Sequence, residues 1–319
     1  MKKPFLSVII PLYNKEKFVA MTIRSVLLQT FTDFEIIIVE DCSTDSSKEI
    51  ATQFVSDTIQ IIPHEYNKGL SASRNTGIRN ANSEYIVFLD ADDLMKSNYL
   101  EKIVSLIYNF PEASIFATNY EELFEEKKAI TPELSLKKFE KDGIIPDFFE
   151  ANLKQPIYCP SSLCVKRNVF DEIGFYNESI TYSEDIDFNI RANLKFLLAY
   201  SKEILIQGIK LDHYRITNCS MKGKKIPDFD SYEHLTERNE TLKKYIDINR
   251  YMLASNYKKE HDLINFNKLK KGISKNSKIS GLNYKQQILL ELPVSLVRIV
   301  SKLKQFLLKR GISFSSFSN

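Results

Sequence analysis

Three aspartates within four residues, Asp90, Asp92 and Asp93, directly follow the apolar run Tyr85–Leu89. So much negative charge beside a buried segment is costly unless water solvates it or a cation binds it. Carboxylate oxygens suit Mg²⁺ or Mn²⁺, and Mg²⁺ commonly takes one or two carboxylates together with substrate phosphates. A solvated turn in which an aspartate caps the next helix explains the same residues, so this cluster alone leaves metal binding and capping equally open.

The segment Asn67–Asn75 has a composition that suits a phosphate. It places Gly69, small residues, Lys68 and Arg74 at the start of an expected helix, where backbone N–H groups and cations favour an anion. Neither GxGxxG nor GxxxxGK[ST] occurs in the sequence, which disfavours a dinucleotide oxidoreductase and a P-loop NTPase. A nucleoside diphosphate held through a metal is compatible with both features.

These side chains lie on segments in which expected strands and helices alternate. The expected strands are the apolar runs 5–10, which Pro11 should end, 34–39, 59–63 and 85–89. The expected helices cover 15–29, a segment from the polar residues 40–45 through Phe54, and 69–81. Such alternation predicts an α/β fold with a mainly parallel, doubly wound, Rossmann-like sheet. Two acidic clusters, Glu40-Asp41 and Asp90/Asp92/Asp93, follow strands of this sheet, and ligands bind beyond the carboxyl ends of such strands.

The second half of the chain has a looser pattern and a further acidic pair. Strands are expected at 114–118 and 158–165, on either side of a charged excursion at 121–141. Glu184 and Asp185 precede an expected helix, so one carboxylate can project from its first turn into a cleft. A general base needs such a position, although the positive end of a helix favours acidic residues without any catalysis.

The composition is that of a soluble globular protein with an uneven charge distribution. The 319 residues are 43% hydrophobic and 27% charged, with a formal net charge of +3. Residues 251–319 contain 13 lysines and arginines but three acidic residues, whereas residues 1–250 are net negative. The four cysteines form no CxxC pair and no zinc-finger spacing, which indicates a reduced, cytoplasmic setting. We expect no signal peptide and no membrane-spanning run.

Five motifs taken together resemble the inverting family 2 glycosyltransferases, which have the GT-A fold. In that family's order and spacing they are SVIIPLYN at 7–14, EDCSTD at 40–45, NKGLSASRNTG at 67–77, DADD at 90–93 and SEDID at 183–187. The resemblance covers about residues 5–220. We therefore expect a GT-A domain over 1–225, with a nucleotide-sugar half at about 1–95 and an acceptor half at about 96–225. A helical C-terminal region with a basic tail follows at 226–319.

The resemblance implies roles for residues that match the family's donor site. Pro11 and Tyr13 would line the base pocket, and Asp41 would read the uracil edge. Arg74 would lie near the diphosphate, and Asp90 would hold the ribose hydroxyls. The alternatives from the residues themselves are loop packing for Tyr13 and a surface ion pair for Arg74.

The same resemblance implies a metal site and a base. Asp92 would bind a Mn²⁺ or Mg²⁺ ion that bridges the two phosphates, while Asp93 is as compatible with a helix cap. Asp185 would be the general base, with Glu184 orienting it or holding the acceptor. His213 would close over the diphosphate or reach the metal, although a lone histidine is more often structural.

The function that this resemblance implies is metal-dependent, inverting sugar transfer. The donor would be a nucleotide-sugar, with UDP favoured, and the acceptor a hydroxyl of a glycan or lipid-linked saccharide in bacterial cell-surface polysaccharide or lipooligosaccharide synthesis. Two other functions compete with it. A receiver-type phosphoacceptor domain has similarly placed acidic residues, and a glycosyltransferase-like binding module would lack turnover.

The segment 292–310 has an apolar face and a basic face when drawn as a helix. A basic amphipathic helix is typical of attachment to an anionic membrane, which would place the enzyme on the inner face of the plasma membrane. Packing of the helix on its own domain or on a partner explains the pattern nearly as well. Nucleic-acid binding is not expected, because the tail lacks a recognisable nucleic-acid-binding motif.

Overall fold

The computed structural model describes residues 3–125, 128–132, 139–209 and 220–297, together with positions 134, 136, 299 and 303. Within these residues ten strands form one sheet. The strands are β1 (Leu6–Leu12), β2 (Phe34–Glu40), β3 (Ile59–Pro63), β4 (Tyr85–Phe88), β5 (Asp93–Met95), β6 (Ile115–Glu125), β7 (Lys128–Ile130), β8 (Asp142–Ile144), β9 (Leu163–Lys166) and β10 (Leu198–Ile209). The α-helices are α1 (Val19–Leu27), α2 (Ser47–Thr52), α3 (Leu70–Asn80), α4 (Tyr99–Asn109), α5 (Phe148–Ala151), α6 (Arg167–Ile173), α7 (Glu184–Asn193), α8 (Glu233–Thr236), α9 (Glu240–Lys259), α10 (Leu263–Gly272), α11 (Ser277–Ser280) and α12 (Tyr284–Glu291).

The sheet has a parallel half and a mixed half. Its order is β3-β2-β1-β4-β9-β6-β10-β5, and the first four strands run parallel to one another. Strand β9 is antiparallel to β4 and β6, β10 is parallel to β6, and β5 is antiparallel to β10. The α/β fold class is thus confirmed, with the doubly wound pattern in the first half. Because the chain runs outward from β1 to β3 and then returns to β4, the ends of β1 and β4 form the switch point at which such sheets bind ligands.

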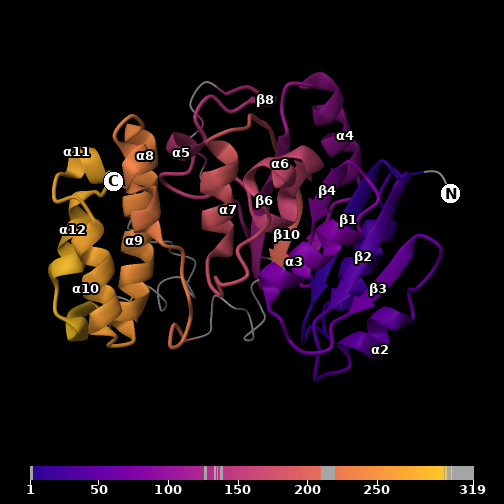
Figure 1. Cartoon of the computed structure of the whole chain (residues 1–319), viewed down its shortest axis with the longest axis horizontal. Coiled ribbons are helices and arrows are strands. Elements are labelled where there is room, and N and C mark those ends of the chain that lie inside the picture. The colour runs from indigo at the N-terminus through magenta and orange to yellow at the C-terminus, as the bar shows by residue number, and fades with distance from the viewer. Residues whose placement is uncertain are drawn as a thin grey trace.

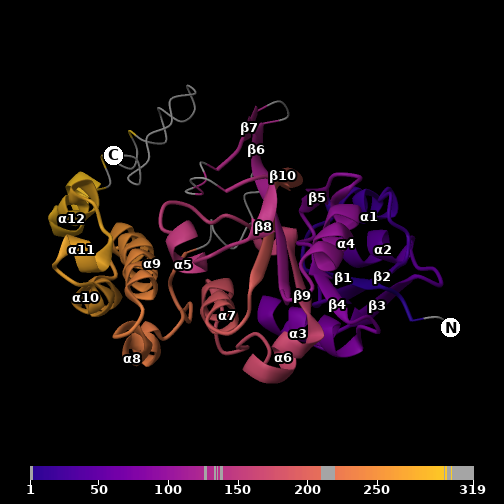
Figure 2. The same cartoon turned by 90° about the horizontal axis from the view of Figure 1, so that it is seen from above.

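Two hydrophobic clusters cover the faces of the sheet. Alternate residues of β1 point to opposite faces, so Leu6 and Val8 belong to one cluster and Ile9 to the other. Helices α1 and α4 cover the first face, and α3 and α6 cover the second (Figures 1 and 2). The helices thereby fix the strand ends that carry the acidic clusters.

Strand β1 continues through Pro11 to Leu12, whereas the sequence predicts that Pro11 ends it. Pro11 pairs with Val39 of β2, but the pairing of β1 with β4 stops at Ile9. Proline lacks an N–H, so it fits a central strand only where no neighbour needs that donor. The β4 side of Pro11 meets this condition, because β4 ends at Phe88.

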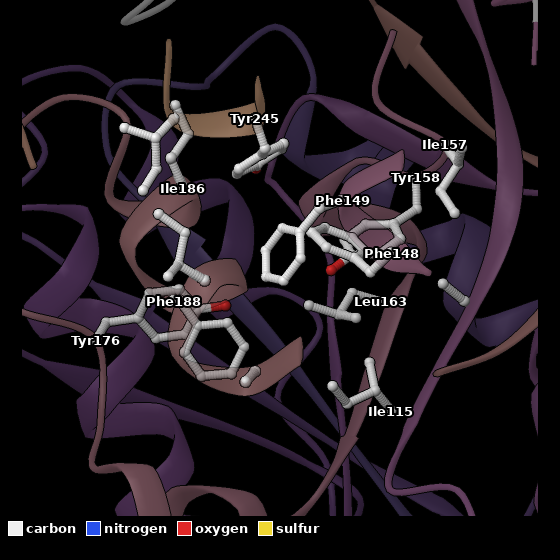
Figure 3. Packing of buried hydrophobic residues seen from close by; sticks show 14 of the residues in the cluster. Ile115, Phe148, Phe149, Ile157, Tyr158, Leu163, Tyr176, Ile186, Phe188 and Tyr245 are labelled. Atoms are coloured by element: carbon white, nitrogen blue, oxygen red, sulfur yellow. The ribbon is translucent and has the colours of Figure 1, made fainter. Parts of the chain in front are cut away.

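The C-terminal helices share the second cluster with the sheet. Tyr245 of α9 packs against Phe148 and Phe149 of α5, with ring centroids 5.8 and 5.4 Å away. Figure 3 shows these rings beside Ile186 and Phe188 of α7. The buried cluster therefore runs across the boundary expected near residue 225, and α9 supports the helix that carries Glu184 and Asp185.

Gly77 allows α3 to lie close to β1. A Cβ atom built at this position would sit 2.4 Å from Cγ2 of Ile9, a fully buried residue. We expect Gly77→Ala to destabilise the protein, because overpacking costs about 1–3 kcal/mol and the better helix propensity of alanine returns at most about 1 kcal/mol. Thermal unfolding should show a lower Tm for Gly77→Ala, and Ile9→Ala, which removes the clashing Cγ2 atom, should lower the Tm by less in the Gly77→Ala background than in the wild type. A Tm equal to that of the wild type would show that the contact relaxes freely.

Candidate active site

The parallel strands β1, β2 and β4 bring three predicted site residues to one edge of the sheet. Leu12 at the end of β1 pairs with Glu40 at the end of β2, and Ile9 pairs with Phe88 at the end of β4. Tyr13, Asp41 and Asp90 follow these strand ends within two residues. Once the strand order is known, the sequence positions of these three residues predict that they lie close together.

The expected base pocket combines a buried and an exposed residue. Pro11 is buried within β1, whereas Tyr13, just beyond the strand, is 44% exposed. The next residue, Asn14, adopts a left-handed conformation with φ of 51° and donates its backbone N–H to Ser43 Oγ at 3.2 Å. An exposed aromatic ring on a fixed turn is able to stack on a planar ligand.

Asp41 is buried and its carboxylate accepts three hydrogen bonds. Oδ1 accepts the backbone N–H of Lys68 at 2.8 Å and lies 2.7 Å from Nδ1 of His64, and Oδ2 accepts the N–H of Gly69 at 2.8 Å. Asp41 thus fixes the loop that leads into α3. Gly69, whose N–H binds Asp41, has a φ of 89°, a conformation that favours glycine.

His64 is a site residue that sequence reasoning missed. Besides Asp41 it contacts Thr76 Oγ1, 2.9 Å from its Nε2 atom. The sequence signal was available, because His64 directly follows β3, and β3 is parallel to the strand that ends before Asp41. Residues after neighbouring parallel strands meet at one edge, so the pair follows from the strand order.

Arg74 is buried and joins Asp90, which follows β4, to Glu184 at the start of α7. Its side chain is 1% exposed, with Nη2 donating to Asp90 Oδ1 at 3.1 Å and Nη1 donating to Glu184 Oε1 at 2.6 Å. Burial opposes the charge of the guanidinium, but the carboxylates of Asp90 and Glu184 outweigh it and raise the Arg74 pKa. The resemblance predicts Arg74 beside the diphosphate; in the structure its two Nη atoms bind carboxylates of the protein, which is the ion-pair alternative in a buried form.

The segment before α7 is fastened to α3. The side chain of Asn75 donates to the carbonyl oxygen of Tyr176 at 2.9 Å and accepts the Tyr176 N–H at 3.0 Å. The Tyr176 ring lies under the Arg74 guanidinium, 5.2 Å away, and stacks on Phe188 with centroids 4.5 Å apart (Figure 3). These contacts hold the start of α7 against Arg74.

Asp185 occupies the first turn of α7, next to Glu184. Ser183 precedes them in a left-handed conformation with φ of 61°, which turns the chain into the helix. Burial and the neighbouring Glu184 carboxylate raise the pKa of Asp185 to about 6, although Arg74 acts in the opposite direction. Such a carboxyl is ionised at neutral pH and is a stronger base than an exposed aspartate.

A group of buried tyrosines lies around Asp185. Burial raises the pKa of each of these phenols, and the Asp185 charge raises it further. The four residues are Tyr120, Tyr158, Tyr176 and Tyr245. They come from separate parts of the chain, one of them from the C-terminal helix α9, so sequence spacing gives no sign of the group.

Asp92 and Asp93 are both buried but have different partners. Asp92 Oδ2 lies 3.0 Å from the Nζ atom of Lys15, a contact that the sequence did not suggest. Asp93 accepts a hydrogen bond from Ser161 Oγ at 2.6 Å and begins strand β5. The helix-cap alternative for Asp93 is therefore wrong, because no helix starts there; the carboxylate instead ties β5 to the segment before β9.

A divalent metal fits this donor set only if the substrate supplies most of its ligands. Within the described residues no group of three or more His, Cys, Asp or Glu side chains gathers around one point. Asp92 and Asp90 offer carboxylate oxygens, which matches the one or two that Mg²⁺ takes when phosphates complete its shell. The last predicted ligand, His213, lies outside the described residues.

Comparison with known proteins gives this site its family. A family model for glycosyl transferase family 2 matches residues 7–174. The uncharacterized glycosyltransferase EpsJ of Bacillus subtilis is 30% identical over 192 residues, which cover 59% of this chain and 56% of that protein. The UDP-Glc:alpha-D-GlcNAc-diphosphoundecaprenol beta-1,3-glucosyltransferase WfgD of Escherichia coli is 34% identical over 116 residues, covering 36% of this chain and 46% of that protein. The chain thus spans about half the length of these curated relatives.

The fold is shared with a solved structure. The crystal structure of S. aureus TarS 1-349 in complex with UDP-GlcNAc has a TM-score of 0.67 and 17% identity, and the match covers 98% of this chain and 93% of that one. The family match includes the strand ends at Asp41 and Asp90 and the helix that carries Arg74. The chain belongs to glycosyl transferase family 2 and has the GT-A fold.

Proposed function

We propose that the protein is an inverting glycosyltransferase that moves a sugar from a nucleotide-sugar to an acceptor hydroxyl. The observation that carries this proposal is the buried bridge from Asp90 through Arg74 to Glu184. It joins the edge of the sheet at which the nucleotide would bind to the helix that carries Asp185, so that donor and base would share one site. Transfer without a covalent intermediate requires that proximity.

The donor in this proposal is a UDP-sugar. The related TarS structures are described as complexes with UDP-GlcNAc and UDP, and the name of WfgD specifies UDP-Glc. Pro11 and Tyr13 would form the base pocket, Asp41 would fix the loop beside the uracil edge, and Asp90 would hold the ribose. Support from the chain itself is that all four residues lie at or directly after the ends of the adjacent parallel strands β1, β2 and β4, at one edge of the sheet.

Asp185 would act as the general base. It accepts the proton of an acceptor hydroxyl while the hydroxyl oxygen bonds to the anomeric carbon and the bond from that carbon to the diphosphate oxygen breaks. The nucleoside diphosphate leaves with the bonding electrons, and attack from the opposite face inverts the anomeric carbon. Glu184 would orient the acceptor or the base through its contact with Arg74.

Asp92 would hold a Mn²⁺ or Mg²⁺ ion on the diphosphate, with His213 as a further ligand. A bound divalent ion supplies charge stabilisation to a departing diphosphate. The chain's part is to keep the Asp92 carboxylate buried and directed by Lys15 at the same edge as Asp90.

The acceptor in this proposal is a glycan or lipid-linked saccharide of bacterial surface-polysaccharide synthesis. The name of WfgD specifies a sugar on a diphosphoundecaprenol lipid. No helix among the described residues is both long and apolar enough to cross a membrane. We propose that residues 292–310 attach the enzyme to an anionic membrane surface on the cytoplasmic side; Leu296, Ile299 and Leu303 of this segment are exposed.

We propose that donor binding, acceptor binding and membrane attachment belong to three parts of the chain, with boundaries near residues 95 and 225. Residues 1–95 would bind the donor, 96–225 would bind the acceptor, and 226–319 would support α7 and carry the membrane segment. Membership of the glycosyltransferase family sets aside the receiver-type alternative. A catalytically inactive module is distinguished from an enzyme by turnover.

The experiment that tests the proposed function is a donor screen. UDP-, GDP- and dTDP-sugars are added with Mn²⁺, and thermal unfolding and nucleoside diphosphate release are followed. The proposal expects one UDP-sugar to raise the Tm and to release UDP slowly. If no nucleotide-sugar changes the Tm or is hydrolysed, the chain does not use such a donor.

Activity should depend on a single ionisation near pH 6. Because burial and Glu184 raise the Asp185 pKa to about 6, the carboxyl is protonated below that pH and accepts no proton. We expect kcat/KM to rise about tenfold per pH unit up to about pH 6 and then to level off. A rate that is flat from pH 5 to pH 8 would exclude Asp185 as the base.

A further inference from the structure

Lys15 forms an ion pair with Asp92, the proposed metal residue. The Nζ and Oδ2 atoms are 3.0 Å apart, and the side chains are 14% and 6% exposed. The pair is far more enclosed than the exposed pair of Lys195 with Glu172, whose side chains are 50% and 54% exposed. In such an enclosed position a carboxylate that loses its cation is strongly destabilised.

The backbone fixes the direction of Lys15. Its N–H donates to Ser47 Oγ at 2.6 Å, and its carbonyl oxygen accepts the N–H groups of Phe18 and Val19, both at 2.9 Å. The preceding Asn14 is held in its left-handed turn by Ser43 and Thr44. Lys15 is therefore directed at Asp92 by two anchored segments rather than by a loose surface loop.

A lysine ammonium and a divalent ion are alternative cations for one carboxylate. The Lys15 ammonium occupies an oxygen of Asp92, and a metal that approaches Asp92 meets a positive charge about 3 Å from that oxygen. Repulsion between two cations so close together opposes their joint binding. A diphosphate changes this balance, because it brings negative charge for both cations.

We infer that Lys15 competes with the divalent metal for Asp92, so that the metal binds tightly only together with the nucleoside diphosphate. Lys15 is then a positioning residue that links metal entry to donor binding. The inference rests on the proposed function only for the identity of Asp92 as the metal residue. By thermodynamic reciprocity, the factor by which UDP improves metal affinity equals the factor by which the metal improves UDP affinity.

The test measures Mn²⁺ affinity of the full chain with and without UDP, by calorimetry or by the Mn²⁺ EPR signal. In the wild type, Mn²⁺ should bind weakly alone and much more tightly with UDP. In Lys15→Met, Mn²⁺ alone should bind about tenfold more tightly or better, and the improvement that UDP causes should shrink by a similar factor. Lys15→Arg, which keeps the charge, and Lys17→Met, at an exposed neighbouring lysine, should behave like the wild type.

Two further variants show whether a change in Mn²⁺ affinity arises from the contact between Lys15 and Asp92. Lys15→Gln serves as a second neutral variant if Lys15→Met does not fold, and the Lys15→Met/Asp92→Asn double variant should lose the gain in Mn²⁺ affinity. Equal Mn²⁺ affinity in the wild type and both neutral variants would overturn the inference, as would a gain that survives Asp92→Asn. If UDP does not bind at all, the proposed function fails, while the Mn²⁺ measurements without UDP still decide the competition at Asp92.

Discussion

Asp185→Asn is expected to abolish sugar transfer while leaving donor binding intact. The amide has nearly the shape of the carboxyl but does not accept the acceptor's proton, and positioned base catalysis contributes about a hundred- to ten-thousand-fold. Asp41 and Asp90, the residues proposed to bind the donor, are on other elements and keep their partners. Single-turnover rates and UDP-sugar affinity, measured side by side, should show a rate loss of at least about a hundredfold with a nearly unchanged Kd.

A measurement of stability distinguishes loss of the base from unfolding of the Asp185→Asn variant. The folded-state pKa of Asp185 is raised to about 6 from an ordinary 3.8, so its ionised form disfavours the folded state as the pH rises through that range. Asp185→Asn should therefore be at least as stable as the wild type at pH 8. Asp171→Asn, an exposed carboxylate on α6, is the matched control and should change neither rate nor Tm. Substantial transfer by Asp185→Asn would remove Asp185 from the base role.

Arg74→Met is expected to weaken both the fold and the activity. It removes the cation that Asp90 and Glu184 share, and breaking a buried ion pair costs about 3–5 kcal/mol. Thermal unfolding should show a fall in Tm of several degrees, and residual folded protein should have lost transfer. The matched control is Arg79→Met on the same helix, whose side chain is 53% exposed and 3.7 Å from Glu178; it should behave like the wild type.

A second substitution distinguishes charge from geometry at this position. Arg74→Lys keeps the charge but lacks the fork that reaches two carboxylates at once. It should recover part of the stability lost in Arg74→Met. It should recover little of the activity, because a lysine at this position holds only one of the two carboxylates. Full activity in Arg74→Lys would show that the bridge between Asp90 and Glu184 is not needed for transfer.

The sequence predicts the parallel half of the fold well because that half rests on short-range patterns. Buried strands appear as continuous apolar runs, and the spacing of Val19, Ile23 and Val26 marks one face of α1. The antiparallel strands β5 and β7, each three residues long, carry too few residues for a pattern. The course of β1 through Pro11 depends on where β4 ends, which no local pattern records.

The contacts of the candidate site also fall into those that the sequence predicts and those that it does not. Asp41 and Asp90 follow strands, so their meeting can be predicted from the strand order. Lys15 with Asp92, and Arg74 with Glu184, pair across 77 and 110 residues, and only the packed helices and strands decide those contacts. A resemblance names such residues without saying what they contact within the protein, so the contacts of Arg74 with two carboxylates come from the structure, and its place beside a diphosphate stays a prediction.

In the proposed mechanism, one base drives a single displacement at the anomeric carbon. Slow hydrolysis of an α-linked UDP-hexose identified in the donor screen tests it without knowledge of the acceptor, because water then takes the acceptor's place. Proton NMR recorded in real time, before the released sugar mutarotates, reads the configuration of the first product. We expect the β anomer to form first with the wild type and neither anomer to form with Asp185→Asn. Release of the α anomer first would contradict this mechanism.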